Sequence, residues 1–251
     1  MTEFESKVIS KVEKICGEYS YSDIEKREYT NGEIAASIEH TNLKPTATSD
    51  DIKKLCEEAV ENKFRSVCIN PSFIPFAKDL LEGTDVKIVT VIGFPLGAMT
   101  TATKIFETEN AIKLGADEID MVLNQGKLKA KNYEAVLFDI SKVVKSAGKK
   151  PVKVIFENCN LTKEEIIAAC VICKEAGAAY VKTSTGFSTG GATLEDVDLM
   201  KFCVGEELKV KAAGGVRDFE MACKMKTHGA DLLGTSSGIT ILNSGKSDEG
   251  Y

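Results

Sequence analysis

The strongest constraint on the fold is a regular alternation of short apolar runs with longer helical segments. After Gly32, candidate strands begin near Ile34, Ser66, Lys87, Glu118, Lys153, Tyr180, Lys209 and Leu232. They are spaced 21 to 35 residues apart, and each interval holds one segment with helical periodicity. Eight strand–helix units of about 30 residues predict an α/β protein that folds as a single (β/α)8 TIM barrel.

The helical segments carry recognisable start and stop signals. Thr162 with Glu165 three residues later, and Thr193 with Asp196, are typical of helix N-termini, whereas Gly177 follows a helical run as a C-cap does. The expected helices cover residues 50–63, 72–81, 101–114, 132–147, 162–176, 193–204 and 218–227, and a short one begins near Ser237.

The barrel does not account for the two ends of the chain. Phe4, Val8, Val12 and Ile15 recur near helical spacing, so residues 1–32 are expected to form an N-terminal helical extension that packs on the barrel. The barrel domain is placed at 33–243 and a flexible tail at 244–251. An open doubly wound sheet is the alternative fold, but the IEHTNLKP stretch after the first strand lacks its glycine-rich fingerprint.

Composition limits the partners of the protein. The chain has 251 residues, with 38 acidic and 32 basic side chains and a net charge of −6, which argues against a nucleic-acid-binding surface. No apolar run approaches the roughly 18 residues that span a bilayer, and the N-terminus lacks the apolar core of a signal peptide. A cytoplasmic protein without nucleic-acid or membrane partners is expected, with its eight cysteines mostly buried and reduced.

Two lysines stand at corresponding positions of neighbouring strands. Val181-Lys182 leads into a Thr/Ser/Gly loop, and Val210-Lys211 leads into two small residues and then two glycines. Active sites of such barrels lie at the carboxyl ends of the strands. Across the ladder the two lysines would begin ~4.8 Å apart, and at an effective dielectric constant of ~20 their charges would repel by roughly 3 kcal/mol. One lysine is therefore expected to be neutral, as a Schiff-base nucleophile must be.

Other strand ends bring further candidate groups to the same mouth. Asp120, between Ile119 and Met121, is a candidate proton shuttle. Loops after strands 6, 7 and 8 form a candidate phosphate site, because exposed backbone N–H groups can hold a dianion without a basic patch. Thr41, at the end of strand 1, is also expected to contact substrate. The candidate phosphate-binding residues are Gly186, Gly214, Gly215, Gly234, Ser236 and Ser237.

These motifs together resemble the deoxyribose-phosphate aldolase family over roughly residues 34–242. The resemblance rests on VKTSTGF (181–187), VKAAGGVR (210–217), GADEIDMV (115–122), GTSSG (234–238), HTNLKPTAT (40–48), VCINP (67–71) and VIGFPLG (91–97). It implies a class I aldolase without metal or cofactor, which interconverts 2-deoxy-D-ribose 5-phosphate with glyceraldehyde 3-phosphate and acetaldehyde. Lys182 matches the Schiff-base lysine, Lys211 the second lysine that perturbs it, and Asp120 the proton-relay aspartate.

The chain departs from the family pattern at several positions. Glu39 stands where the family usually has the shorter aspartate, near the second lysine, and Asn42 replaces a common leucine. Phe187 stands where some members carry a phosphate-contacting lysine, so phosphate binding would depend more on backbone donors. Some members end in a tyrosine that helps proton transfer, so Tyr251 is an auxiliary candidate, with a disordered end as the alternative.

Several patterns favour structural roles. Cys170 and Cys173 have redox-like spacing but fall inside a helix, where their thiols are expected to be core. His40 and His228 are too far apart in sequence to suggest a metal site.

Two other functions remain alternatives: another lysine-dependent aldolase or transaldolase, and an inactive phosphosugar-binding protein. A homodimer or homotetramer is expected, with the N-terminal helix as a candidate interface.

Overall fold

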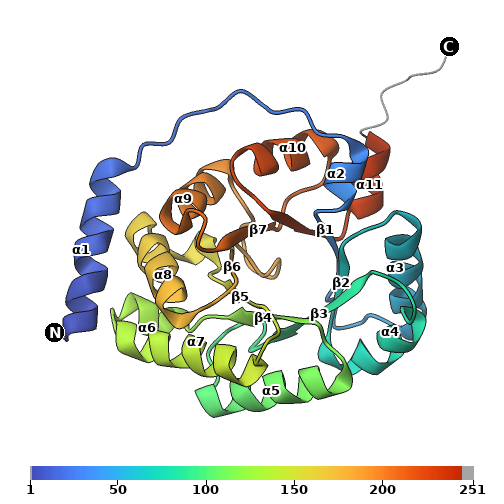
Figure 1. Ribbon diagram of the computed structural model, residues 1–251, viewed down its shortest axis with the longest axis horizontal. Coiled ribbons are helices and arrows are strands. Elements are labelled where there is room, and N and C mark those ends of the chain that lie inside the picture. Colours follow the sequence, from blue (N-terminus) through green and yellow to red (C-terminus); the bar gives the residue numbers. More distant parts are fainter. Residues whose placement is uncertain (1, 245–251) are drawn as a thin grey trace.

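The protein is a closed barrel of eight parallel strands surrounded by helices, as the sequence predicted (Figure 1). The computed structural model describes residues 2–244. Each strand pairs with its neighbours in sequence, and β1 closes the barrel by pairing with β8, His40 opposite Thr235. The strands are β1 (Ile38–Asn42), β2 (Ser66–Ile69), β3 (Lys87–Ile92), β4 (Glu118–Val122), β5 (Val152–Ile155), β6 (Tyr180–Lys182), β7 (Lys209–Ala213) and β8 (Leu232–Thr235).

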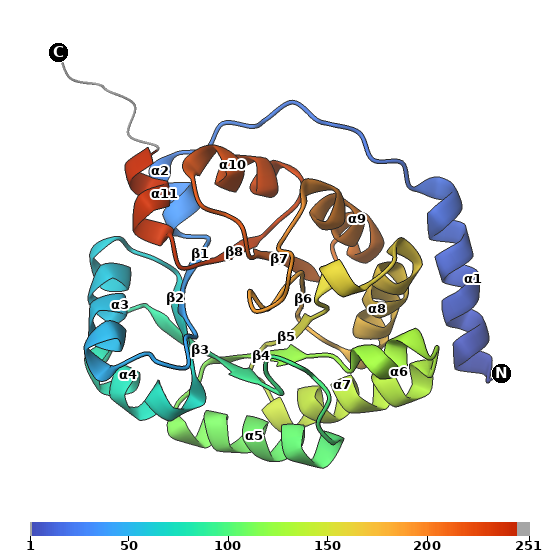
Figure 2. The same cartoon turned by 180° about the vertical axis from the view of Figure 1, so that it is seen from behind.

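One principal helix follows each strand and covers the outside of the barrel (Figures 1 and 2). These helices are α3 (Ser49–Glu61), α4 (Ile74–Leu80), α5 (Thr101–Leu114), α7 (Tyr133–Ala147), α8 (Lys163–Ala176), α9 (Leu194–Val204), α10 (Phe219–Thr227) and α11 (Gly238–Ser244). The additional helices are α1 (Glu3–Glu18), α2 (Asn31–Ala35), α6 (Gln125–Lys129) and the 3-10 turns η1 (Pro71–Phe73) and η2 (Asn158–Asn160).

The predicted helix ends are confirmed at the residues that signalled them. Thr162 and Glu165 form a reciprocal capping box at the start of α8, and the Thr193 side chain accepts the N–H of Asp196 at the start of α9. Gly177 ends α8 in the left-handed conformation, with φ of 74°. These contacts satisfy backbone groups that a helix end leaves without intrahelical partners.

The first strand was predicted at the wrong place. Residues near Ile34 form helix α2, because Thr30 and Glu33 make a capping box there, and β1 begins at Ile38. The predicted carboxyl ends of two other strands were also too early. Apolar residues continue β4 past Asp120 to Val122 and β7 past Lys211 to Ala213, so both charged residues lie inside the barrel wall.

The N-terminal helix lies outside the ring, against α7 and α8 (Figures 1 and 2). Its Val8 is fully buried, and residues 166–173 of α8, which α1 covers on the outside, are buried as well. The segment that follows continues past α9, where the Tyr19 hydroxyl donates to the carbonyl of Glu195 at 3.3 Å, and Tyr21 stacks on His228. Within residues 2–244, no helix is long and apolar enough to cross a membrane.

The cysteines are mostly core residues. Cys170 and Cys173 are buried free thiols in the middle of α8, as predicted. Cys159 departs from the expectation of buried thiols, because η2 after β5 leaves it exposed.

Candidate active site

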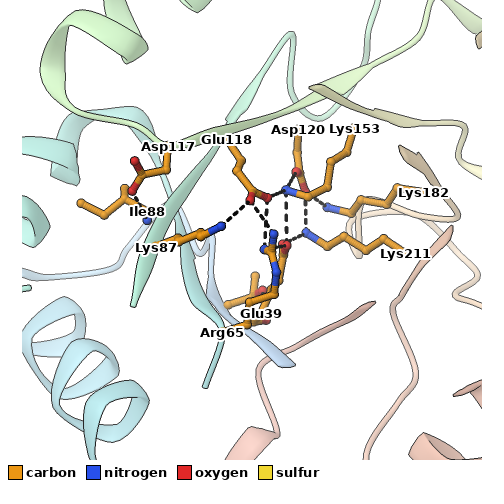
Figure 3. Close-up of polar contacts among 11 residues, drawn as sticks. Glu39, Arg65, Lys87, Ile88, Asp117, Glu118, Asp120, Lys153, Lys182 and Lys211 are labelled. Carbon is orange, nitrogen blue, oxygen red and sulfur yellow. Dashed lines mark hydrogen bonds and ion pairs between the residues drawn. The ribbon is translucent and has the colours of Figure 1, made fainter. Parts of the chain in front are cut away.

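Lys182 and Lys211 lie opposite each other on β6 and β7, and both donate to one carboxylate oxygen. The Nζ atoms of Lys182 and Lys211 are 2.7 and 2.6 Å from Oδ2 of Asp120 (Figure 3). Because parallel strands alternate their side chains between two faces, the register of β4, β6 and β7 points all three groups into the barrel. Asp120 and Lys211 have no exposed surface, and Lys182 is 3% exposed.

A larger charge network continues from this pair through the barrel interior. Glu39 on β1 bonds Lys211 through one carboxylate oxygen and Arg65 through the other, the latter at 3.0 Å. Lys153 on β5 lies 3.0 Å from Asp120 Oδ1 and 2.7 Å from Glu118 Oε2. The Glu39 carboxylate therefore connects a lysine of β7 to Arg65.

The protein moves the pKa values of the two facing lysines in opposite directions. Burial lowers the pKa of Lys182, with Lys211 adding to the effect and Asp120 opposing it. Burial alone would also lower the pKa of Lys211, but Asp120 and Glu39 outweigh it and raise that pKa. From the sequence, repulsion between the two lysines was predicted to lower the pKa of one of them. In the structure, the loss of hydration on burial lowers the pKa of Lys182 more than Lys211 does.

Asp120 remains a carboxylate within this network. Burial on its own would raise the pKa of Asp120, but Lys153, Lys182 and Lys211 together hold it well below its usual range. At Glu118 burial is likewise outweighed by the hydrogen bond from Arg65 and by Lys153, and its pKa falls to about 2. The carboxylates are thus ionised, and Lys182 is the member of the network that is driven toward the neutral form.

Lys182 opens onto a cavity of about 780 Å³ at the carboxyl ends of the strands. The structure brings the predicted phosphate-site residues and Thr41 to the wall of this same cavity. The predicted residues that line it are Lys182, Thr41, Gly186, Gly214, Gly215, Gly234, Ser236 and Ser237. Phe187 also lines it, and its ring packs edge-on against Phe94 at 5.2 Å.

The glycines of the cavity wall are required by the backbone. Gly214 and Gly215 have φ of 83° and 85°, in the left-handed region that other residues rarely adopt. At Gly234, a Cβ would come within 2.9 Å of Lys211 Cε, so only glycine lets β8 pass this close to the second lysine.

Not every predicted residue can be placed at the site. Tyr251 lies outside the described residues. Thr41 lines the cavity and its hydroxyl donates to the carbonyl of Glu39 at 2.9 Å. His40 also lines the cavity, and its Nε2 is 2.8 Å from Glu58 on α3. Among residues 2–244, no group of three or more His, Cys, Asp and Glu side chains is arranged to hold a metal ion.

Sequence reasoning missed several charged residues around the site. Lys153 and Glu118 are fully or almost fully buried charges in otherwise apolar strands, and that pattern was the available signal. Arg217 lines the cavity and lies in the VKAAGGVR motif, although the motif alone gave it no role. Glu157 is buried with φ of 61°, and its carboxylate accepts the N–H of Thr185 at 3.1 Å. This contact holds the loop after Lys182.

Comparison with known proteins identifies the family. A family model described as DeoC/LacD family aldolase matches residues 7–244. The deoxyribose-phosphate aldolase of Thermotoga maritima is 61% identical over 214 residues, which cover 85% of this chain and 86% of that protein. The deoxyribose-phosphate aldolase of Carboxydothermus hydrogenoformans is 58% identical over 222 residues, covering 87% of this chain and 97% of its own.

A solved structure agrees with these sequence matches. The deoxyribose-phosphate aldolase of Aeropyrum pernix, described as a tetramer, superposes with a TM-score of 0.81 at 30% identity and covers 98% of this chain and 99% of its own. The family model spans the whole barrel, and the chain therefore belongs to the deoxyribose-phosphate aldolase family of lyases.

Proposed function

We propose that the protein reversibly cleaves 2-deoxy-D-ribose 5-phosphate to D-glyceraldehyde 3-phosphate and acetaldehyde through a Schiff base on Lys182, as a step in deoxyribose phosphate catabolism. One observation carries the proposal. Among the described charged residues of the interior network, Lys182 is the one that lines the cavity. Of the lysines in this network, Lys182 is also the one whose pKa is lowered, with burial as the largest cause, whereas the pKa values of Lys153 and Lys211 are raised. A neutral amine at the floor of a substrate-sized cavity is the nucleophile that iminium chemistry requires.

The first half of the reaction builds the iminium. The Lys182 amine adds to the C1 aldehyde of the open-chain sugar, and the resulting carbinolamine loses its hydroxyl as water. The Asp120 carboxylate is within hydrogen-bond distance of both Lys182 and the cationic Lys211. Protons can therefore move among these three groups without bulk solvent. The product is a C1 iminium covalently bound to Lys182.

The second half breaks the C2–C3 bond. A base takes the proton of the C3 hydroxyl, that oxygen becomes a carbonyl, and the C2–C3 electron pair moves into the iminium to form an enamine. D-glyceraldehyde 3-phosphate leaves. The enamine then takes a proton at its terminal carbon, and water hydrolyses the new iminium to acetaldehyde and the free amine. Asp120 and Lys211 are the groups we assign to these proton transfers.

The phosphate end of the substrate would be held by the glycine and serine loops after β6, β7 and β8. Gly186, Gly214, Gly215, Ser236 and Ser237 all line the cavity. Arg217 adds a guanidinium to the same lining. Fixing the phosphate lets binding energy orient C1 against Lys182, so that the attack becomes effectively intramolecular.

Turnover with competing substrates tests the reaction. The protein is expected to release acetaldehyde from 2-deoxyribose 5-phosphate and to leave fructose 1,6-bisphosphate intact. Lys182→Ala, with circular dichroism unchanged, is expected to abolish turnover. Faster cleavage of fructose 1,6-bisphosphate would instead favour another lysine-dependent aldolase, and full binding without turnover in the wild type would favour an inactive sugar-phosphate binder.

Assembly and location stay predictions. The Aeropyrum pernix relative is described as a tetramer. In this chain α1 packs on α7 and α8 of the same chain, which uses its buried face. Light scattering of the full chain would distinguish a monomer from the expected homodimer or homotetramer. The cytoplasmic location and the lack of nucleic-acid and membrane partners rest on the sequence.

A further inference from the structure

Lys153 is a fully buried lysine that does not line the cavity, yet it contacts three carboxylates. Its Nζ is 3.0 Å from Asp120 Oδ1, 2.7 Å from Glu118 Oε2 and 3.3 Å from Glu39 Oε1 (Figure 3). Burying an ammonium without exposure to water is costly, and the protein compensates with these contacts. The register pairs Lys153 directly with Asp120 across β4 and β5.

The three carboxylates do not depend on Lys153 equally. Oε1 of Glu39 also bonds Arg65, at 3.0 Å, and Oε2 of Glu118 bonds the same guanidinium at 3.1 Å. Oδ1 of Asp120 has Lys153 as its partner among the described residues, whereas Oδ2 takes both Lys182 and Lys211. Removing Lys153 would therefore leave Oδ1 of Asp120 without this partner, and Asp120 is the carboxylate beside Lys182.

The charges of the interior network balance only when one lysine is neutral. Within the described residues, the carboxylates of this network are Glu39, Glu118 and Asp120, and its buried or mostly buried cations are Arg65, Lys153, Lys211 and Lys182. Lys87 contacts Glu118 only at 3.8 Å, and its half-exposed side chain is screened by solvent. Three anions thus face four cations, and a neutral Lys182 amine restores equality.

The groups around Lys182 come from several strands. They are Asp120 on β4, Lys211 on β7 and Cys68 on β2, with Lys153, Glu39, Glu118 and Arg65 behind them. Burial raises the pKa of the Cys68 thiol, so it adds no charge near neutral pH. Asp120 is therefore the anion that would stabilise a protonated Lys182 if the other cations around Asp120 were removed.

We propose that Lys153 is a positioning residue for the aldolase reaction: it supplies the cation that neutralises Asp120 from behind, and so leaves Lys182 free of charge. The proposal rests on the Schiff-base function assigned to Lys182. Lys153 touches neither substrate nor a reacting atom, and it acts through Asp120. A purely structural lysine would contribute to folding but would leave the ionisation of Lys182 unchanged.

Reductive trapping measures that ionisation without requiring full turnover. Acetaldehyde and borohydride label Lys182 at a rate that follows its neutral fraction, and the pH of half-maximal labelling reports when the amine forms. In Lys153→Met, Lys182 becomes the third cation facing three carboxylates. The midpoint is expected to rise by about one to two pH units, as for a unit charge removed roughly 6 Å away at an effective dielectric constant of about 20.

A second substitution restores the balance. In Lys153→Met/Glu118→Gln two anions face Arg65 and Lys211, so the midpoint is expected to return to near the wild-type pH. Glu118→Gln alone removes an anion and should move the midpoint downward, and it provides the test if Lys153→Met does not fold. If Lys153 had only a structural role, the double variant would instead be less stable than either single variant.

Lys104 is the matched control. It is also fully buried and pairs with a carboxylate, Asp139, at 2.5 Å, but this pair lies between α5 and α7, away from the cavity. Lys104→Met is expected to lower the melting temperature and leave the midpoint in place. Unchanged midpoints in both Lys153→Met and Glu118→Gln would overturn the proposal. If the wild type itself is never labelled at Lys182, the proposed function fails instead.

Discussion

Lys182 and Lys211 are register partners on adjacent strands, and they share one oxygen of Asp120, yet their pKa values move in opposite directions. The difference arises from what lies behind each amine. Lys211 also contacts Glu39, so a second carboxylate stabilises its charge. Lys182 has Asp120 alone as a salt-bridge partner among the described residues and borders the cavity. The same barrel layer thus holds one lysine whose pKa is raised and one whose pKa is lowered.

Asp120→Asn is expected to lower kcat/KM for deoxyribose 5-phosphate cleavage by about 10² to 10⁴, the usual contribution of a positioned general acid or base. The measurement is steady-state acetaldehyde release. Asp139→Asn is the control, because Asp139 is also buried against a lysine but lies away from the cavity. Both variants should lose stability, because Asp139→Asn leaves Lys104 without its carboxylate and Asp120→Asn removes one carboxylate from Lys153 and Lys211. Equal loss of turnover in both would contradict a chemical role for Asp120.

Glu118 should make the protein sensitive to acid. Its pKa is about 2 in the folded state against 4.5 for the free side chain, so the folded state binds this proton less readily. The associated stability, about 3 kcal/mol, is complete above pH ~4.5 and is lost as the pH falls toward 2. Urea unfolding across this range should show a shallower acid slope for Glu118→Gln than for wild type. Glu175→Gln should change the slope much less, because Lys7 lowers the pKa of Glu175 only through an exposed pair that solvent screens.

Much of the fold could be predicted because its signals are local. Alternating strands and helices fix the barrel, and capping residues such as Thr162 fix helix ends within one residue or two. The first strand was misplaced because Ile34 satisfies an apolar strand pattern equally well. Only the capping box between Thr30 and Glu33 distinguishes the short helix.

The residues of the candidate site could be predicted where they stand in a motif at the end of a strand. They could not be predicted where they join the site through contacts with residues distant in the sequence. Lys182 and the glycine loops are visible as motifs, and the cavity brings them together. Lys153 and Arg65 belong to the network through side chains that meet across the barrel axis, and no short stretch encodes that meeting. Likewise, the dominant effect of burial on Lys182 requires the closed barrel.

Gly215→Ala should weaken binding of phosphorylated substrate selectively. Gly215 has φ of 85° and lines the cavity, so a methyl group strains the backbone and stands where the phosphate would approach. KM for deoxyribose 5-phosphate is expected to rise about tenfold, with a much smaller change for deoxyribose. Gly148→Ala is the control: it also has positive φ with open space, but it ends α7 far from the site. Each should cost about 1–2 kcal/mol of stability.

Glu157→Gly tests whether the Glu157 carboxylate supports the loop after Lys182, because the substitution relieves the backbone strain at this position and removes the carboxylate. Glycine relieves the positive φ at this position but removes the carboxylate that accepts the N–H of Thr185. Since Thr185 Oγ1 in turn accepts the N–H of Phe187 at 3.0 Å, the cavity loop should loosen and kcat/KM should fall about tenfold. Lys131→Gly, which relieves a φ of 55° elsewhere, should leave kcat/KM at the wild-type value. A Glu157→Gly enzyme with wild-type kcat/KM would contradict this role.

The central claim is that Lys182 is the covalent residue, and peptide mapping after borohydride reduction with acetaldehyde tests it most directly. One reductively ethylated lysine, Lys182, is expected. No ethylation of Lys211 or Lys153 is expected, because both are held as cations by carboxylates. Labelling of Lys211 in place of Lys182, or no labelling at the barrel mouth, would contradict the account.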